Sequence, residues 1–499
     1  VNINKRFGDY SLVANIGTSI MNNKYDDLSY RGPIREKGIP NVFNVYDLDN
    51  TKKKARQDEW QEQTQSIFDS VEVGWKSMLY LTLTGRNDWA SQLKGSNPTS
   101  FFYPSVGLSA VISEMVTLPK AIDYLKVRGS FSAVGTPYPR FLVQPTYSYD
   151  PTKQDWNAKT HYPIGKLKPE RTDSWEIGVD GTFFKDFKVS GSFYYANTYN
   201  QTFDPKITVS SGYSTLYVQT GYVRNLGVEG LLSYGHTWRD FGWNSNFTFS
   251  WNKNKIVELV KDYVHPETGE IVNKDRLELK GLGYTKFILK EGGTLGDLYT
   301  NADFIRDDKG YIQIDKNGDV AKTVNLPDIK LGSVFPKANL AWNNSFSYKG
   351  IYAGFQLSAR LGGIVYSATQ AALDQYGVSE ASAAARDRGG VLVNGRSWVN
   401  AQQYYEIVAT SSGLPQYYTY SATNLRLQEA HIGYTIPRKW LGNICDINVS
   451  VVGRNLWMIY CKAPFDPEAI ATTSNFYQGI DYFMMPSTRN FGFNVKINF

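Results

Sequence analysis

The sequence predicts an all-β protein, a membrane-spanning antiparallel β-barrel, on three observations. Many segments alternate strictly between apolar and polar residues, and successive residues of a strand point to opposite faces. These segments reach the roughly 9–11 residues that a tilted strand needs to cross a bilayer, whereas strands of globular proteins usually have about 5–6. Short and long connections alternate along the chain, as in barrels with short periplasmic turns and long extracellular loops.

The last segment, "TRNFGFNVKINF", illustrates the alternation. The same pattern recurs in "LYLTLTGRNDW", "SWEIGVDGTF", "WNSNFTFSWN" and "IYAGFQLSARLGG". We expect the apolar sides to contact lipid and the polar sides to line a wet lumen. In the last segment the lumen side carries Asn490, Asn494, Lys496 and Asn498, and the lipid side carries Phe491, Phe493, Val495, Ile497 and Phe499.

Fourteen segments of this kind can be counted, separated in turn by short links such as "FKD" and "YKG" and by long loops. A soluble sandwich or propeller is the alternative, but it has shorter strands and no reason to keep this asymmetry of loops. The segments lie near 10–20, 62–74, 77–87, 101–112, 124–133, 173–183, 187–199, 224–238, 243–257, 337–347, 351–361, 425–436, 446–460 and 486–499. The expected extracellular loops cover about 21–61, 134–172, 200–223, 258–336, 362–424 and 461–485.

Composition agrees with a single β architecture over residues 1–499. Aromatic residues are abundant, with 35 Tyr, 26 Phe and 12 Trp, and 43 Gly accompany them. Charges are nearly balanced, 53 basic against 47 acidic, and scattered, which argues against nucleic-acid binding. Cys445 and Cys461 bracket one predicted strand that spans roughly 50 Å, so we expect free thiols. Trp89, Trp238 and Tyr460 near strand ends would form an interfacial aromatic girdle.

A set of ordered motifs resembles the SusC/RagA-type TonB-dependent transporters of Bacteroidetes outer membranes. The motifs are "YLTLTGRNDWASQL", "SFFYPSVGLS", "LKVRGSFSAVGTP", "LKPERTDSWEIGVD", "VRNLGVEG", "NLRLQEAHIGYTIPRKWL", "VVGRNLWMIY", "FDPEA" and "MPSTRNFGFNVKINF". Each motif is weak alone, but their order and spacing match the C-terminal barrel part of that family over nearly the whole chain.

The resemblance implies that the chain forms the C-terminal 14–15 strands or so of a barrel of about 22 strands. A plug domain and a TonB box, which the family also has, are expected to lie outside this chain. The implied function is TonB-dependent import of a nutrient across a Gram-negative outer membrane. Members of the family carry oligosaccharides or oligopeptides, and an oligosaccharide is the preferred expectation. The implied partners are a SusD-like surface lipoprotein that acts as a lid, the TonB complex, and outer-membrane lipid.

Two other classes of function remain open. A passive porin or a surface adhesin would share the barrel pattern. An outer-membrane hydrolase would need acidic residues and a His gathered at the barrel mouth, and His161 and His265 lie in long loops. The sequence has no HExxH or GxSxG motif and no Cys beside a His. We therefore expect neither catalysis nor a cofactor.

Aromatic residues cluster in the long loops. Flat amphipathic rings stack on sugars or grip peptide side chains, and they also pack loops or form interfaces with a lid protein. As candidates for contact with the substrate or with the lid we take Tyr147, Tyr149, Trp156, Tyr404, Tyr405, Tyr417 and Tyr418.

Three shorter features complete the prediction. In "IDKNGDV", Asp315, Asn317 and Asp319 have the spacing of a calcium loop, but the later bidentate Glu is missing. A plain hairpin turn is therefore expected, and a calcium-binding loop is the alternative. "FDPEA" is expected to order an extracellular loop. By resemblance, the terminal Phe499 matches the signal that the outer-membrane assembly machinery recognises.

Overall fold

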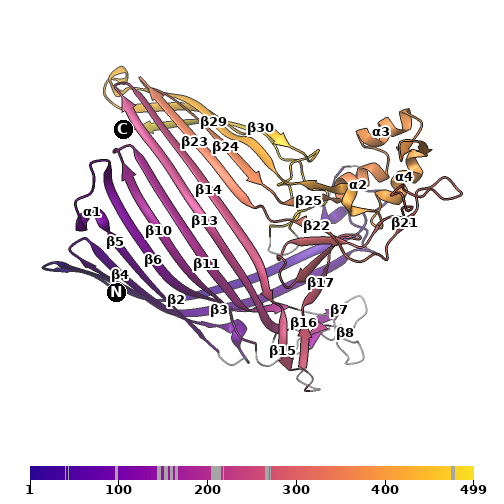
Figure 1. The fold of residues 1–499 in the computed structure, drawn as a ribbon, viewed down its shortest axis with the longest axis horizontal. Coiled ribbons are helices and arrows are strands. Elements are labelled where there is room, and N and C mark those ends of the chain that lie inside the picture. Colours follow the sequence, from indigo (N-terminus) through magenta and orange to yellow (C-terminus); the bar gives the residue numbers. More distant parts are fainter. Residues whose placement is uncertain are drawn as a thin grey trace.

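One antiparallel sheet of fifteen strands forms the wall of the protein in the computed structural model (Figure 1). The sheet is curved, and its two edges are β1 and β32. In order across the sheet, the strands are β1 (Asn2–Phe7), β2 (Tyr10–Arg31), β3 (Lys54–Trp75), β4 (Leu79–Ala90), β5 (Phe101–Val111), β6 (Ile122–Thr136), β10 (Glu170–Phe183), β11 (Phe187–Phe203), β13 (Val218–Trp238), β14 (Phe241–Glu258), β23 (Ala338–Tyr348), β24 (Ile351–Leu361), β29 (Asn424–Ile436), β30 (Asp446–Cys461) and β32 (Asn490–Asn498).

The structure describes all residues except 40, 43, 96–98, 143–147, 151–154, 158–160, 163–166, 204–214, 217, 265–268, 270 and 474–477. Among the described residues, none of the helices has the length and apolar character needed to cross a membrane. Cys445 and Cys461 are both free thiols, as predicted.

Each of the fourteen predicted segments corresponds to a strand of this sheet. The strand missing from the prediction is β1, which pairs with β2 from Asn2↔Asn15 to Phe7↔Tyr10. The first predicted loop, 21–61, is too long, because β2 and β3 stay paired as far as Arg31↔Lys54. Polar residues predominate in these outer parts, and the few apolar residues, such as Tyr25 and Leu28, lie on opposite faces. Alternation therefore cannot reveal these parts, although backbone pairing continues.

Short turns connect the strands at one end of the sheet, which we call the short-turn end; the opposite end is the long-loop end. Only Lys349 and Gly350 link β23 to β24, with φ of 47° and 91°. Two residues with positive φ make a type I′ turn, whose twist matches that of paired strands. Lys76 and Ser77 after β3 also have positive φ, 50° and 58°. These turns fix the register of each hairpin.

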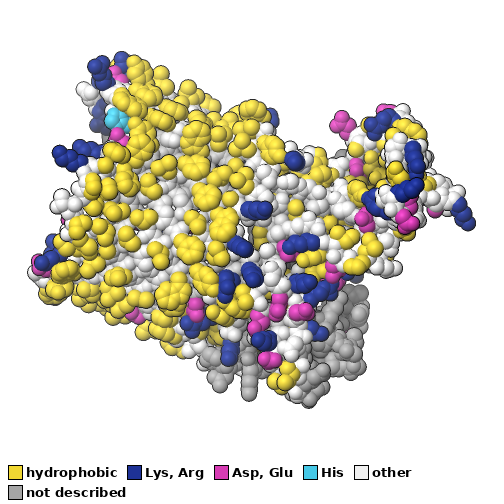
Figure 2. Space-filling model, viewed as in Figure 1, with side chains coloured by type: hydrophobic (Ala, Val, Ile, Leu, Met, Phe, Trp, Pro, Cys, Tyr) yellow, Lys and Arg dark blue, Asp and Glu magenta, His cyan; other side chains and the backbone are white. Residues whose placement is uncertain are grey.

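The outer and inner faces of the sheet differ in chemistry. On β10, Trp175, Ile177 and Val179 are 60%, 65% and 41% exposed on one face, while Glu176 and Asp180 lie on the other. Figure 2 shows hydrophobic side chains in a broad band that covers the strands from the short-turn end. Outward exposure of large apolar residues on strands long enough to cross a bilayer is the pattern of a lipid-facing surface.

The long connections after β14 and β24, joined by a short strand from the connection after β30, fold together at the long-loop end into a compact unit. Its apolar core includes Phe287, Leu298, Val334 and Tyr366. We call this unit the cap (Figure 1). Its main elements are β17 (Arg276–Lys280), β18 (Lys286–Lys290), β19 (Asp297–Thr300), β20 (Asp303–Phe304), β21 (Lys322–Thr323), β22 (Ile329–Ser333), β25 (Ile364–Ser367), α2 (Ala368–Gln375), α3 (Glu380–Asp387), β26 (Val391–Val393), β27 (Ser397–Val399), α4 (Ala401–Val408), η4 (Pro415–Tyr418), β28 (Thr419–Ser421) and β31 (Ile480–Asp481).

The remaining elements are short and lie in the connections between wall strands. They are η1 (Val45–Asp47), η2 (Ser91–Leu93), α1 (Ile112–Met115), β7 (Ser148–Asp150), β8 (Asp155–Asn157), β9 (His161–Tyr162), β12 (Thr215–Leu216), β15 (Val260–Val264), β16 (Ile271–Lys274) and η5 (Arg438–Leu441).

Candidate functional site

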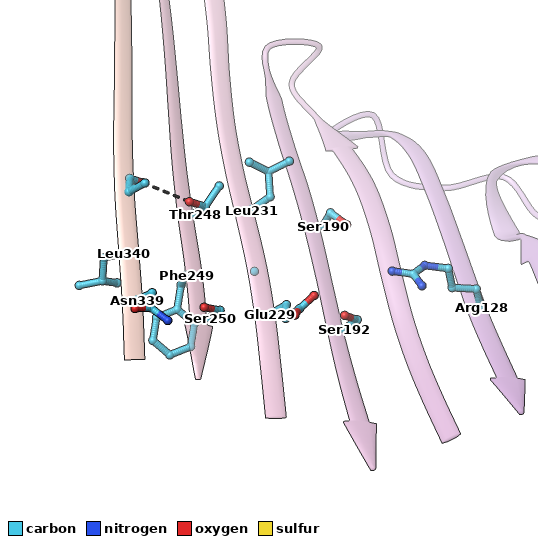
Figure 3. Close-up of a pocket in the computed structure, with 12 residues that line it drawn as sticks. Arg128, Ser190, Ser192, Glu229, Leu231, Thr248, Phe249, Ser250, Asn339 and Leu340 are labelled. Atoms are coloured by element: carbon cyan, nitrogen blue, oxygen red, sulfur yellow. Dashed lines mark hydrogen bonds between the residues drawn. The ribbon is translucent and has the colours of Figure 1, made fainter. Parts of the chain in front are cut away.

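A hollow of about 410 Å³ lies on the inner face of the sheet, against β11, β13, β14 and β23 (Figure 3). Its lining includes four short side chains with hydroxyl groups, Ser190, Ser192, Thr248 and Ser250, beside the apolar Leu231 and Ala341. Because these side chains are short, the backbone of the wall is accessible here. The alternation that gives the strands an apolar outer side therefore also produces an open polar hollow on the inner side.

A polar row crosses this hollow. Ser192, Glu229, Ser250 and Asn339 are successive cross-strand partners on four neighbouring strands. Such partners lie about 4.5–5.5 Å apart, so hydroxyl, carboxylate and amide groups follow one another across the wall. Among the described residues, no Lys, Arg or His makes an ion pair with Glu229. The row can donate and accept several hydrogen bonds to one polar ligand.

Arg128 of β6 borders the hollow and is neutralised by two acids of β10. Its guanidinium contacts the carboxylate of Glu176, and its Nε lies 3.5 Å from Asp180 Oδ2. Gly178 stands between the two acids, and a Cβ built there would lie 2.6 Å from Arg128 Cζ. The glycine thus gives the guanidinium room to lie against the sheet.

The "GRNDW" motif forms a second inner-face cluster. Arg86 Nε lies 2.7 Å from Asp88 Oδ1, and Arg86 Nη2 donates to Ser66 Oγ at 2.8 Å. The hydroxyl of Tyr103, from the "SFFYPS" motif, donates to Asp88 Oδ2 at 2.7 Å. Asp88 is only 7% exposed. Two motifs that carry the family resemblance therefore meet in one network that joins β3, β4 and β5.

Tyr418 is a core residue of the cap. Its side chain is 4% exposed, and its hydroxyl donates to Asp374 Oδ2 at 2.9 Å. Burial and the neighbouring carboxylate of Asp374 raise the pKa of Tyr418. Tyr418 therefore packs the interior of the cap. Loop packing is the role that the sequence analysis gave as the alternative to contact with the substrate or the lid.

Tyr404, Tyr405 and Tyr417 surround the same core. The Tyr404 and Tyr405 rings are half-buried against it, with centroids 5.4 Å apart. Burial raises the pKa of Tyr404 to about 12. Tyr417 is 40% exposed, and its ring lies 5.2 Å from that of Phe304. Among the four predicted contact residues Tyr404, Tyr405, Tyr417 and Tyr418, Tyr417 offers the most surface to a ligand or partner.

The other predicted contact residues lie in the connection between β6 and β10. Tyr149 and Trp156 face each other on the β7–β8 hairpin with ring centroids 5.3 Å apart, and they are 50% and 62% exposed. Tyr147 lies outside the described residues. His161 lies in β9, and His265 is outside the described residues. The structure brings Tyr149 and Trp156 together as an exposed aromatic pair.

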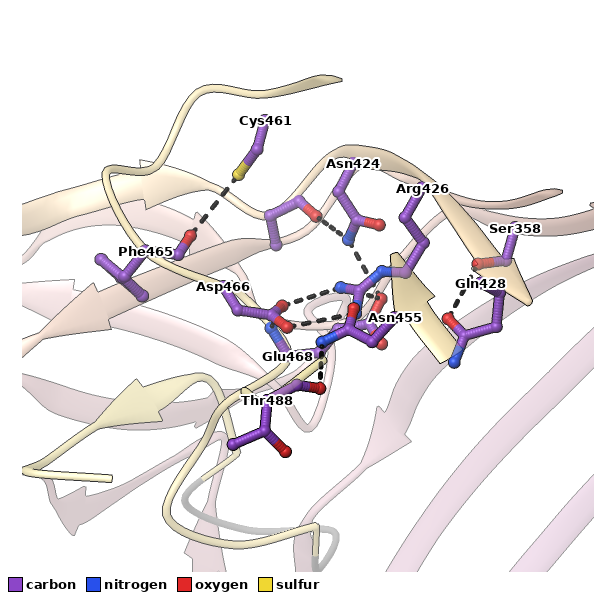
Figure 4. A network of polar contacts seen from close by, with 11 residues as sticks. Ser358, Asn424, Arg426, Gln428, Asn455, Cys461, Phe465, Asp466, Glu468 and Thr488 are labelled. Carbon is purple, nitrogen blue, oxygen red and sulfur yellow. Dashed lines mark hydrogen bonds and ion pairs between the residues drawn. The ribbon is translucent and has the colours of Figure 1, made fainter. Parts of the chain in front are cut away.

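Asp466 of the "FDPEA" motif binds Arg426 on β29 (Figure 4). Arg426 Nη2 donates to Asp466 Oδ1 at 2.7 Å, Arg426 Nη1 donates to Oδ2 at 3.1 Å, and Asn424 Nδ2 donates to Glu468 Oε1 at 3.0 Å. Burial alone would raise the pKa of the Asp466 carboxyl, but the hydrogen bonds from Arg426 and from the N–H of Glu468 lower it below its ordinary value. The motif attaches the loop after β30 to the neighbouring strand.

Asp315, Asn317 and Asp319 form a tight turn. Asp315 Oδ1 accepts from the backbone N–H of Asn317 at 2.8 Å and of Asp319 at 3.0 Å. The predicted hairpin turn is confirmed by the bridge between Ile314 and Val320. In the described part of the chain, no group of three or more His, Cys, Asp or Glu side chains is placed to hold a metal ion.

Phe499 directly follows β32 and is 85% exposed. Its role as an assembly signal stays a prediction. Glu229, Arg128 and Arg426 were not among the predicted site residues. All three lie on the polar side of predicted strands. Their position in the apolar/polar alternation could therefore have identified them as lumen-facing candidates.

Comparison with known proteins agrees with this architecture. The family model "TonB dependent receptor-like, beta-barrel" matches residues 2–456. TonB-dependent receptor P3 of Formosa agariphila is 25% identical over 464 residues, which are 86% of this chain and 45% of that protein. TonB-dependent receptor SusC of Bacteroides thetaiotaomicron is 24% identical over 246 residues, 44% of this chain and 24% of that protein.

Among solved structures, the fold is similar to that of the RagAB peptide importer in its "open-open" state. The TM-score is 0.73 at 17% identity, and the match covers 99% of this chain and 53% of the other. The chain thus spans about half the length of TonB-dependent receptor P3 and of the RagAB structure. The resemblance to SusC/RagA-type transporters and the outer-membrane location are confirmed. The chain belongs to the TonB-dependent receptor-like β-barrel family and forms a large part of the wall of an outer-membrane barrel.

Proposed function

We propose that the chain supplies the lumen wall and outer loops of a transporter that imports an oligosaccharide across the outer membrane. The observation that carries this proposal is the polar row across the inner hollow, on a wall whose outer face suits lipid. Long loops of outer-membrane barrels are extracellular, so the cap and the β7–β8 hairpin face the outside. A ligand captured there would enter a lumen lined by hydrogen-bonding groups.

Two features favour an oligosaccharide over an oligopeptide. The row of Ser192, Glu229, Ser250 and Asn339 matches the many hydroxyls of a sugar, which need donors and acceptors at close spacing. The exposed pair Tyr149 and Trp156 offers flat rings on which sugars stack. An oligopeptide is the runner-up, and the solved relative of similar fold is described as a peptide importer.

Import requires partners that the chain does not contain. A SusD-like lipoprotein would close over the long-loop end, where the exposed Tyr417 of the cap is available for contact. The TonB complex would supply energy through a TonB box on a plug domain. A barrel of this size is filled by its plug, so passive flow is blocked.

Uptake by cells that carry the full-length gene tests the proposal. We expect labelled oligosaccharides to enter, and a protonophore to stop their entry because TonB transmits the proton-motive force. Glu229→Trp would fill the hollow and lower uptake, whereas Val228→Trp, on the lipid-facing side of the same strand, is the control and should import normally. Purification from native membranes should yield a lipoprotein lid with the barrel.

Other results would point to the alternatives. Uptake that the protonophore does not affect would indicate a passive porin. Surface binding without entry would indicate an adhesin. Entry of labelled peptides but not of oligosaccharides would replace the substrate and keep the transport function.

A further inference from the structure

Three basic residues form a cluster on the outer face of the wall near its long-loop end. Arg224 on β13 and Lys255 on β14 are direct cross-strand partners, and Lys253 lies two residues from Lys255 on the same face. Val228 and Trp251, which are also partners, lie on this face just toward the short-turn end. The cluster therefore begins where the apolar band ends. Figure 2 shows Lys and Arg side chains at this border.

Neutral groups hold Arg224 in place. Its Nη2 donates to the Tyr222 hydroxyl at 2.5 Å and its Nε to Asn197 Oδ1 at 3.3 Å. The guanidinium carbon lies 5.0 Å from the Tyr195 ring centroid and 5.5 Å from that of Tyr222. These contacts orient the guanidinium without cancelling its charge.

The three charges are not neutralised within the described part of the chain. None of Arg224, Lys253 and Lys255 makes an ion pair there, and both lysines are exposed. The acids nearest in the sheet are already engaged: Asp173 pairs with Arg171 at 2.7 Å, and Glu258 pairs with Lys261 at 4.0 Å. A site with three positive charges thus remains for an external anion.

We propose that this cluster binds the phosphorylated headgroup of the outer-leaflet glycolipid. A basic cluster beside a lipid-facing surface recognises anionic headgroups, because the acyl chains lie along the apolar band while the charge meets the cations. In a Gram-negative outer membrane, the outer leaflet presents lipid A, a disaccharide that carries phosphate. The inference rests on the outward orientation of the long loops argued above and is independent of the imported substrate.

Lipid titration of the purified full-length transporter tests this inference. The probes are phosphorylated lipid A and the same lipid after enzymatic dephosphorylation, and native mass spectrometry counts the bound lipid. We expect the triple variant R224Q/K253Q/K255Q to bind phosphorylated lipid A roughly 100-fold more weakly, and each of K253Q and K255Q about fivefold more weakly. Lys253 and Lys255 are exposed, so the single variants should fold normally. Their lipid affinity can therefore be measured even if the triple variant folds poorly.

The matched control removes three exposed lysines at the short-turn end, K120Q/K185Q/K439Q, and should bind lipid A like the wild type. Equal binding by the wild type and the two single variants, or equal binding of the dephosphorylated lipid, would overturn the inference. Displacement of lipid A by millimolar inorganic phosphate would also overturn it, because the site would then recognise free phosphate. If the protein binds lipid A through this cluster but imports no labelled ligand, the inference stands and only the proposed function is contradicted.

Discussion

The guanidinium of Arg426 and the carboxylate of Asp466 lie side by side in a bidentate pair, with N–O distances of 2.7 and 3.1 Å. Their side chains are only 6% and 9% exposed. The pair joins a wall strand to a loop 40 residues farther along the chain. A loop that leaves the membrane is thereby held close to the wall.

Asp466→Ala should detach this loop and destabilise the protein. Removing one partner of a buried ion pair costs about 3–5 kcal/mol when the other charge is left unpaired. The carboxylate of Glu468, 3.4 Å from Arg426 Nη2, offsets part of that cost here. Arg454→Ala is the control, because Arg454 pairs with Glu429 at 2.9 Å but is 67% exposed, and exposed pairs contribute about 0–1 kcal/mol. Urea unfolding of the full-length protein in detergent measures both changes. Equal losses would show that burial of the Arg426 pair does not matter.

The same loop should stay attached in mild acid. The pKa of Asp466 is lowered in the folded protein, so ionised Asp466 stabilises the fold above the ordinary carboxyl value of 3.8, and this contribution disappears as the pH falls through the lowered value. A nitroxide label at Pro464→Cys, with Cys445 and Cys461 replaced by Ser, reports loop mobility. Mobility should rise only below the ordinary carboxyl pKa. A rise that begins well above that value would contradict the prediction.

Two glycines of the "VRNLGVEG" motif should respond differently to alanine. A Cβ at Gly227 would lie 2.5 Å from the carbonyl oxygen of Trp251 and from the Tyr194 ring, whereas at Gly230 nothing lies within 4 Å. Gly227→Ala should therefore cost about 1–3 kcal/mol, as overpacking does, and Gly230→Ala should change little. Urea unfolding compares the two variants. A neutral Gly227→Ala would show that β13 and β14 separate easily.

Tyr418→Phe should loosen the cap but leave the wall intact. It removes the hydrogen bond to the buried Asp374, whose other hydrogen bond comes from Gln370 Nε2 at 3.1 Å, and an unsatisfied buried group costs about 1–3 kcal/mol. Tyr417→Phe is the control, since its exposed hydroxyl only accepts from Arg306 at 3.3 Å. Hydrogen exchange of the cap amides measures the effect. Faster exchange in the wall strands as well would mean that the cap does not unfold separately.

The wall could be predicted because its signal is local. Each strand shows its own alternation, and lipid contact keeps one side apolar from end to end. The outer parts of β2 and β3 were missed where this contact stops: Tyr25 and Trp60 stack there at 5.3 Å, but polar residues predominate on both faces around them. Pairing of the backbone leaves no pattern in the sequence when neither face is apolar.

The candidate site was less predictable. Parity places Glu229 on the lumen side, yet its neighbours Ser192 and Ser250 follow only from the register of three strands. Loops have no period at all. Tyr417 and Tyr418 are adjacent in sequence, but one is 40% and the other 4% exposed, because η4 turns one ring outward and the other into the cap core.

The short turns have a consequence for how such proteins diversify. Lys349 and Gly350 set the register of their hairpin from one end, and the other short turns act in the same way. Residues inserted or deleted at the opposite end leave that register unchanged. Evolution can therefore exchange whole loops, and with them the molecules that the protein recognises, without redesigning the part embedded in lipid.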